Sequence, residues 1–117
     1  MRDTVFVSIV LPVYNESDRI EAVLLSLFNQ NTKDELITHD TYELIIVDNN
    51  STDDSVAKIN AFSESHPVMD ILVIDEKVQG VSSARKRGMD YASLRSKARD
   101  SRLGKKRKHY IVSADAD

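Results

Sequence analysis

Four short apolar segments, separated by stretches with helical periodicity, constrain the fold of this chain more than any other feature. The segments are residues 6–13, 42–47, 71–74 and 110–112. The first is almost continuously apolar and rich in β-branched residues, which is typical of a strand covered on both faces, as in parallel sheets. Strands that alternate with helices predict an α/β fold in which a mainly parallel sheet is flanked by helices.

The helices are expected between these strands. Apolar residues recur at i, i+3, i+4, i+7 and i+8 from Ile20 to Phe28, which predicts an amphipathic helix that either Asn15 or Ser17 caps. A second helix is expected after Ser51 or Thr52, where residues 51–54 (STDD) resemble a capping box. A third should run from about residue 81 towards residue 97, followed by a long basic connection.

Length and composition indicate one domain, residues 1–117, with a modest core. The absence of cysteine excludes disulfides and thiolate metal sites. No apolar run approaches the roughly 20 residues of a membrane span, and the N-terminus is a poor signal peptide. We therefore expect a soluble, cytoplasmic protein.

The net charge of −3 hides an asymmetry. The stretch from Arg95 to Lys108 holds eight of the 16 Lys and Arg residues and one acid, so the rest of the chain carries −10. Such a block either contacts an anionic surface or is a solvated connector. No aromatic residue interleaves with these charges, so nucleic acid is not an expected partner, and membrane contact through this segment is not favoured.

Polar side chains follow every predicted strand at the end where parallel sheets bind ligands. The strand ends read 11–16 (LPVYNE), 47–53 (VDNNSTD), 74–76 (IDE), followed by 79–85 (QGVSSAR), and 113–117 (SADAD). Each delivers carboxylates or amides to the same edge of the sheet. The sequence therefore predicts a ligand site there.

Asp115 and Asp117 follow the last strand one residue apart. In an extended backbone, residues i and i+2 face the same side, so both can offer oxygens to a hard cation such as Mg²⁺ or Mn²⁺. The alternative is a solvated acidic tip. A divalent cation stabilises negative charge on a diphosphate that leaves a sugar, which connects this pair to the other strand ends.

The other candidate residues each have two interpretations. Asp48 either accepts a hydrogen bond from a base or ribose, or caps the next helix. Tyr14 either stacks on a base or is packed, and Glu16 either meets the ribose or favours a helix N-terminus. Gly80 permits a close approach of backbone to a ligand, and Arg85 either binds phosphate or forms a surface ion pair.

Taken together, residues 7–16 (VSIVLPVYNE), 46–53 (IVDNNSTD), 79–85 and 115–117 (DAD) resemble the family 2 glycosyltransferases, which have the GT-A fold and use nucleotide-diphosphate sugars. The resemblance implies that the chain is the N-terminal, donor-binding half of a metal-dependent glycosyltransferase with an unknown acceptor. It implies a nucleotide pocket lined by Pro12, Tyr14 and Glu16, a base contact at Asp48, and donor binding through Gly80 and Arg85. It further implies that Asp115 approaches the ribose or a metal-bound water while Asp117 ligates the metal.

In this family the acceptor half, with the catalytic base of inverting members, follows the Asp-x-Asp motif. We therefore assign no catalytic residue, and we expect this chain alone to turn over slowly or not at all.

Three rival functions have weaker support. A nucleotidyltransferase would carry a glycine-rich basic loop after the first strand, but residues 12–16 contain neither glycine nor lysine. A non-enzymatic module would bind an anionic surface through Arg95–Lys108. A phosphate-accepting receiver-like domain also clusters acids at strand ends, but the lysine expected after a later strand is missing.

Overall fold

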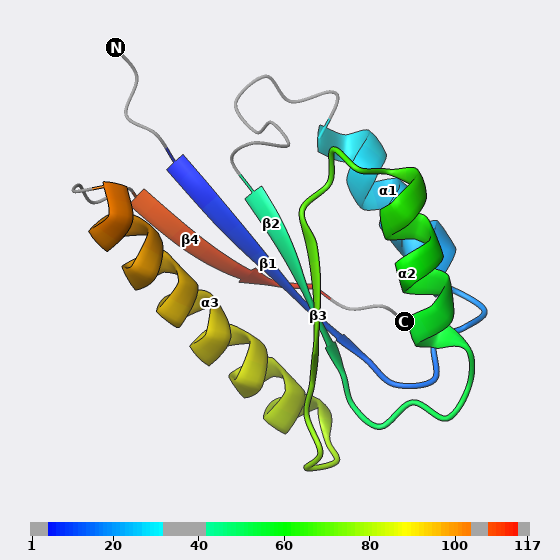
Figure 1. Ribbon diagram of the computed structural model, residues 1–117. Helices are drawn as coiled ribbons and strands as arrows, with labels where there is room; N and C mark the ends of the chain where they lie inside the picture. The colour runs from blue at the N-terminus through cyan, green and yellow to red at the C-terminus, as the bar shows by residue number, and fades with distance from the viewer. Residues whose placement is uncertain (1–4, 32–41, 104–107, 115–117) are drawn as a thin grey trace.

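The computed structural model describes residues 5–31, 42–103 and 108–114. Strands and helices alternate along the chain, as the sequence predicts (Figure 1). The elements are β1 (Val5–Val13), α1 (Ile20–Asn31), β2 (Tyr42–Asp48), α2 (Ser55–Ser65), β3 (Ile71–Asp75), α3 (Val81–Leu103) and β4 (Lys108–Ser113).

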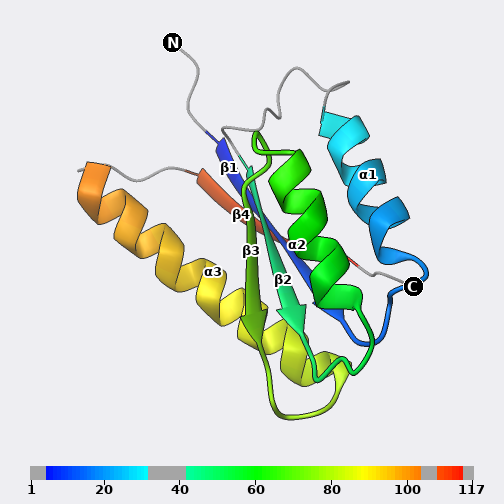
Figure 2. The ribbon, with the colours of Figure 1, turned by 45° about the vertical axis from the view of Figure 1, so that its right-hand side comes forward.

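The four strands form one parallel sheet in the order β3-β2-β1-β4. The chain builds the sheet outward from β1 through β2 to β3, and then returns to place β4 on the other side of β1 (Figure 2). This reversal creates a topological switch point between β1 and β4, where ligands of open α/β sheets usually bind. The prediction of a parallel α/β sheet is confirmed.

Helices cover both faces of the sheet. Helices α1 and α2 lie side by side on one face, and α3 crosses the other (Figures 1 and 2). The core under α1 and α2 includes Leu11, Ile20, Leu24, Ile46 and Ile59, none of which is exposed. The apolar stripe predicted for α1 therefore faces the sheet, as expected.

A glycine allows α3 to approach the sheet closely. The core on this side contains Val10, Ile45, Val47 and two small helical residues, Ala84 and Ala92. A Cβ atom on Gly88 would overlap Cγ1 of Val10 and would lie 3.0 Å from Cγ2 of Val47. The absence of a side chain at this position is therefore a packing requirement.

Helix α3 extends further than the sequence indicated. The basic stretch after residue 96 was expected to be a connection, but the helix continues to Leu103. Arg95 and Arg99 lie one helical turn apart and both reach Glu43 of β2, at 2.8 and 3.2 Å. Glu43 has no exposed surface. Its buried ion pairing attaches this part of α3 to the sheet, whereas a solvated connector would make no such contact.

Ser8 and His109 complete the hydrogen bonding around Glu43. Ser8 Oγ donates to Glu43 Oε2 over 2.8 Å and lies 2.8 Å from His109 Nε2. A hydroxyl has a single proton, and that of Ser8 is donated to Glu43. Ser8 Oγ must therefore accept its second hydrogen bond from an N–H at Nε2 of His109. Arg99 also lies 3.6 Å from the ring centroid of Phe6. Charge and hydrogen bonding thus fix α3 to β1, β2 and β4.

The pH dependence of stability should report on His109. Burial, with a further contribution from the Arg99 guanidinium, lowers the pKa of His109, although Glu43 and Asp100 oppose the shift. A histidine whose pKa is lower in the folded state stabilises the fold fully above about pH 6.5, its unfolded value, and this contribution is lost as the pH falls below that.

We therefore expect the urea midpoint of the wild type to fall more between about pH 7.5 and about pH 5.5 than that of His109→Gln, which keeps an amide donor for Ser8. Burial and the Glu43 charge raise the pKa of Asp70, which acts in the opposite direction but equally in both proteins. Parallel pH profiles for the two proteins would contradict this assignment.

The predicted capping box before α2 is wrong. Helix α2 begins at Ser55, and its N-cap residue Asp54 makes no side-chain capping hydrogen bond. Asp53 instead accepts from the Ser55 backbone N–H at 3.0 Å and from the Ser55 hydroxyl at 2.6 Å. At the other end of α2, His66 is the C-cap residue, and its backbone N–H donates to Ser63 O at 3.3 Å.

Among the described residues, no helix has both the length and the apolar character to cross a membrane.

Candidate functional site

The carboxyl ends of β1, β2 and β3 lie in register. Val13 pairs with Asp48, and Asp48 pairs with Asp75. Backbone hydrogen bonds continue just beyond the strands, because Asn49 N donates to Val13 O and Glu76 N donates to Asp48 O. Beside β4, Ala114 N donates to Val10 O. The four strand ends therefore converge on one edge, here called the carboxyl edge, as the sequence predicts.

The loop after β1 is tied to the loop after β2. Asn15 has a left-handed backbone, with φ of 49°, and its side-chain oxygen accepts from the backbone N–H groups of Thr52 and Asp53 at 2.7 and 3.3 Å. Its own N–H donates to Ser51 Oγ at 3.0 Å. The sequence predicts either Asn15 or Ser17 as the cap of α1, but the Asn15 side chain holds this neighbouring turn instead.

Three further bonds join the same two loops. Glu16 N donates to Ser55 Oγ at 2.9 Å, and Ser17 N donates to Asp53 Oδ2 at 3.2 Å. Lys58 Nζ donates to the Ser17 carbonyl at 2.8 Å. The hydrogen bond from the Ser55 hydroxyl lowers the pKa of Asp53. The segment that carries Tyr14 and Glu16 is therefore held in a fixed position relative to Asp48.

The predicted nucleotide-pocket residues lie at this edge with different exposures. Tyr14 is 50% exposed, which excludes the packed alternative. Pro12 and Glu16 are partly buried. Asp48 is partly buried and its Oδ1 accepts from Ser51 N at 3.3 Å, a turn contact.

Gly80 and Arg85 bring the start of α3 to the carboxyl edge. Gly80 has φ of 134°, a conformation that side chains rarely adopt, and a Cβ there would meet no atom within 4 Å. The space beside this glycine is therefore open. Arg85 Nε donates to Ser113 Oγ over 2.8 Å, so the helix contacts the end of β4. Ser113 is not among the site residues that the sequence predicts.

Asp115 and Asp117, the predicted metal ligands, lie outside the described residues. Within residues 5–31, 42–103 and 108–114, no group of three acidic, histidine or cysteine residues is arranged to hold a metal ion. Ala114, the last described residue before this pair, lies at the carboxyl edge beside Val10.

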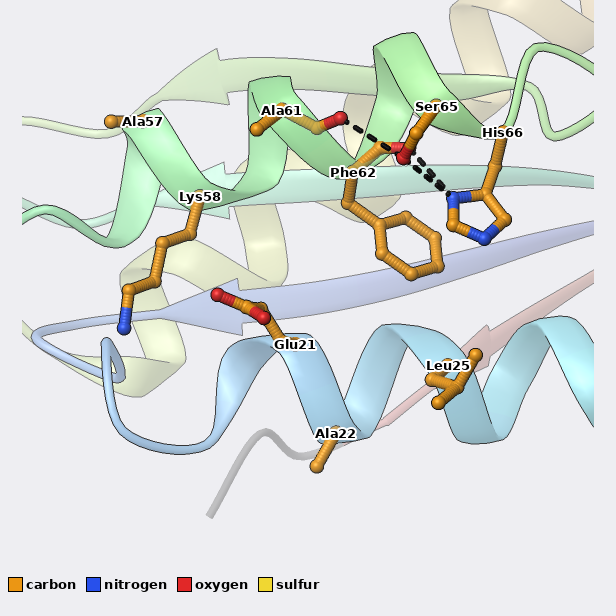
Figure 3. A pocket seen from close by; sticks show the side chains of 9 residues that line it. All are labelled: Glu21, Ala22, Leu25, Ala57, Lys58, Ala61, Phe62, Ser65 and His66. Carbon is orange, nitrogen blue, oxygen red and sulfur yellow. Dashed lines mark hydrogen bonds between the residues drawn. The ribbon is translucent and has the colours of Figure 1, made fainter.

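An apolar cavity of about 570 Å³ lies elsewhere, between α1 and α2 (Figure 3). Its walls are formed by Glu21, Ala22, Leu25, Ala57, Lys58, Ala61, Phe62, Ser65 and His66. None of these is a predicted site residue. His66 stacks on Phe62 with their ring centroids 3.9 Å apart, so this histidine has a packing role.

The basic segment is not the uniform surface that an anion-binding module would need. The Arg95 and Arg99 side chains are only 32% and 12% exposed and point to Glu43. Lys97 and Arg102 are exposed, and residues 105–107 lie outside the described part of the chain. Two of the eight positive charges are therefore used inside the fold.

The chain is similar in sequence to known glycosyltransferases. The chain is 34% identical over 88 residues to "Glycosyltransferase AglE" of Haloferax volcanii, covering 75% of this chain and 27% of that protein. It is 32% identical over 93 residues to the Escherichia coli "UDP-Glc:alpha-D-GlcNAc-diphosphoundecaprenol beta-1,3-glucosyltransferase WfgD", covering 80% and 33% of the two chains. The chain thus spans about a quarter to a third of the length of these relatives.

Two solved structures share the fold. The mannosyltransferase PcManGT from Pyrobaculum calidifontis, solved in complex with GDP-Man and Mn²⁺, matches with a TM-score of 0.61 and 26% identity over 74% of this chain and 24% of that one. S. aureus TarS 1-349 matches with a TM-score of 0.58 and 19% identity over 96% and 27%, which shows a common fold.

The described sheet is thus the Rossmann-like part of a GT-A fold, as predicted. The glycosyl transferase family 2 domain matches residues 8–117, nearly the whole chain. This protein belongs to glycosyl transferase family 2.

Proposed function

We propose that this chain is the donor-binding half of a metal-dependent glycosyltransferase, which transfers a sugar from a nucleotide-diphosphate sugar to an acceptor. The observation that carries the proposal is the convergence of the ends of β1, β2 and β4 with the start of α3 at one edge. The names of the relatives support it, because WfgD is a UDP-glucose-dependent transferase and PcManGT was solved with GDP-Man and Mn²⁺.

In this proposal each loop holds one part of the donor. Asp48 accepts a hydrogen bond from the base, and the exposed ring of Tyr14 stacks against it, with Pro12 and Glu16 lining the same pocket. The backbone at Gly80 approaches the diphosphate where the space is open, and Arg85 provides positive charge to its oxygens. The family resemblance and the positions of these residues at the carboxyl edge support these roles.

Asp115 and Asp117 are the proposed metal ligands. Two carboxylates are a suitable donor set for Mg²⁺ or Mn²⁺, because hard cations take oxygen ligands and Mg²⁺ retains several waters. The bound cation would supply Lewis-acid stabilisation of the departing diphosphate. The acceptor and the catalytic base are not assigned to residues of this chain.

Calorimetry with a panel of uridine and guanosine diphosphate sugars, with and without Mn²⁺, tests the proposal directly. We expect heat of binding for at least one donor, and tighter binding with the metal. Absence of heat for every donor, whether or not Mn²⁺ is present, would refute the assignment of this edge as a donor site.

Two aspartates should have separable effects in the same assay. Asp48→Ala should weaken binding at least about tenfold even without metal, because a hydrogen bond to a charged group is lost. Asp117→Ala should instead remove most of the Mn²⁺ dependence. Asp90→Ala is the matched control. Asp90 is exposed on α3, and the ion pair described for it is with Lys86. Equal effects of the first two variants would contradict the division of roles.

A further inference from the structure

Asn49 follows Asp48 at the end of β2, and this residue is only 2% exposed. Both of its polar atoms contact the loop between β3 and α3. Its Oδ1 accepts from Gly80 N at 2.8 Å, and its Nδ2 donates to the carbonyls of Glu76 and Val78 at 2.8 and 2.9 Å. A single buried side chain thus satisfies three backbone groups of a segment about thirty residues away in sequence.

The Asn49 amide supplies both the acceptor and the donors that this environment requires. Gly80 presents an N–H donor and the other two groups are carbonyl acceptors, so the amide orientation is fixed. Aspartate would have no donor for the carbonyls, and an aliphatic residue of similar size would leave all three groups unpaired. The hydrogen bonding at this position therefore requires a side-chain amide.

The contact is placed where it controls the geometry of the candidate donor site. Asn49 N donates to Val13 O, which anchors the residue to β1 as well. Gly80 O accepts from Ala84 N, so the glycine that Asn49 holds also begins the hydrogen bonding of α3. Arg85 follows within the same turn and contacts Ser113 of β4. Asn50 adds a bond from its Nδ2 to the Lys77 carbonyl at 3.0 Å.

We propose that Asn49 is a positioning residue. It holds residues 76–80 so that Gly80 and Arg85 lie at a fixed distance from Asp48, and a bound nucleoside diphosphate spans that distance. The inference rests on the proposed function for the identity of the ligand. Asn49 acts through the loop and does not contact the nucleotide. Its loss should therefore weaken recognition of the diphosphate while recognition of the nucleoside part by the β1 and β2 loops is retained.

The first measurement needs no ligand. Amide hydrogen exchange by NMR should show protection at Gly80 N–H in the wild-type protein, and Asn49→Ala should remove it. Two control variants should keep the protection at Gly80 once it is compared with the global stability of each variant. Asn60→Ala changes an exposed asparagine on α2, and Ile59→Val lowers stability through the core. Asn49→Ser provides a milder change should the alanine variant fail to fold. Unchanged exchange at Gly80 in the Asn49 variants would overturn the inference.

The second measurement is the affinity for UDP and GDP compared with that for the corresponding nucleosides, by calorimetry. Asn49→Ala should weaken diphosphate binding about tenfold or more and nucleoside binding less than about threefold. An equal loss for both ligands indicates a merely structural role and overturns the inference. If the wild type binds neither diphosphate, the proposed function fails, and Gly80 exchange alone decides whether Asn49 positions the loop.

Discussion

Glu43→Ala is expected to destabilise the fold by about 3 kcal/mol, the largest effect among the variants considered. The substitution leaves Arg95 and Arg99 without their carboxylate and leaves Ser8 without its acceptor. Breaking a buried pair by removing one partner typically costs about 3–5 kcal/mol. The lower end applies because Arg95 is one-third exposed and can be partly solvated once the carboxylate is gone.

Urea denaturation followed by circular dichroism measures this loss. Glu43→Gln should cost less, because the amide oxygen still accepts hydrogen bonds from an arginine. Glu64→Ala, at an exposed position of α2, serves as the control and should change stability by less than about 0.5 kcal/mol. If Glu43→Ala behaved like this control, the ion pair would have no role in attaching α3.

Gly88→Ala is expected to destabilise the protein by about 1–3 kcal/mol, although alanine is the better helix former. Helix propensity alone would favour alanine by about 1 kcal/mol. The added methyl group, however, overlaps Val10 and lies close to Val47, both buried in the sheet with no exposed surface. Neither side chain can turn to solvent, so overpacking outweighs propensity.

A double-mutant cycle with Val10→Ala isolates this clash, because it removes the Cγ1 atom that the new methyl group would overlap. We expect the double variant to be more stable than the sum of the two single changes predicts. Ser93→Ala on the exposed side of α3 should be neutral or slightly stabilising. Strict additivity, or a more stable Gly88→Ala, would show that the helix does not need close contact here.

The features that the sequence predicted are those that local patterns determine. Apolar runs identified the strands, the spacing from Ile20 to Phe28 identified the buried face of α1, and parallel strands require their carboxyl ends to meet. The convergence of residues 12–16, Asp48, Gly80 and Arg85 at one edge follows from these facts alone.

The missed features depend on partners that are distant in sequence. Asn15 and Asn49 look like ordinary turn residues, and only the fold places other loops against their amides. The sequence does not predict the full length of α3, because its last turns depend on the hydrogen bonds of Arg95 and Arg99 to Glu43, more than fifty residues earlier. A lone acid inside an otherwise apolar strand was the available signal, since a buried carboxylate requires a cationic partner.

The strand order also has a consequence for synthesis on the ribosome. Strand β1 pairs with β4, and Val5 lies opposite Lys108, so translation must advance about a hundred residues past the start of β1 before that side of the strand is covered. At roughly 5–20 residues per second, a nascent chain waits on the order of 5–20 s with this hydrogen-bonding edge open. Chaperones that shield unpaired strands would have their main opportunity to act on this protein during that interval.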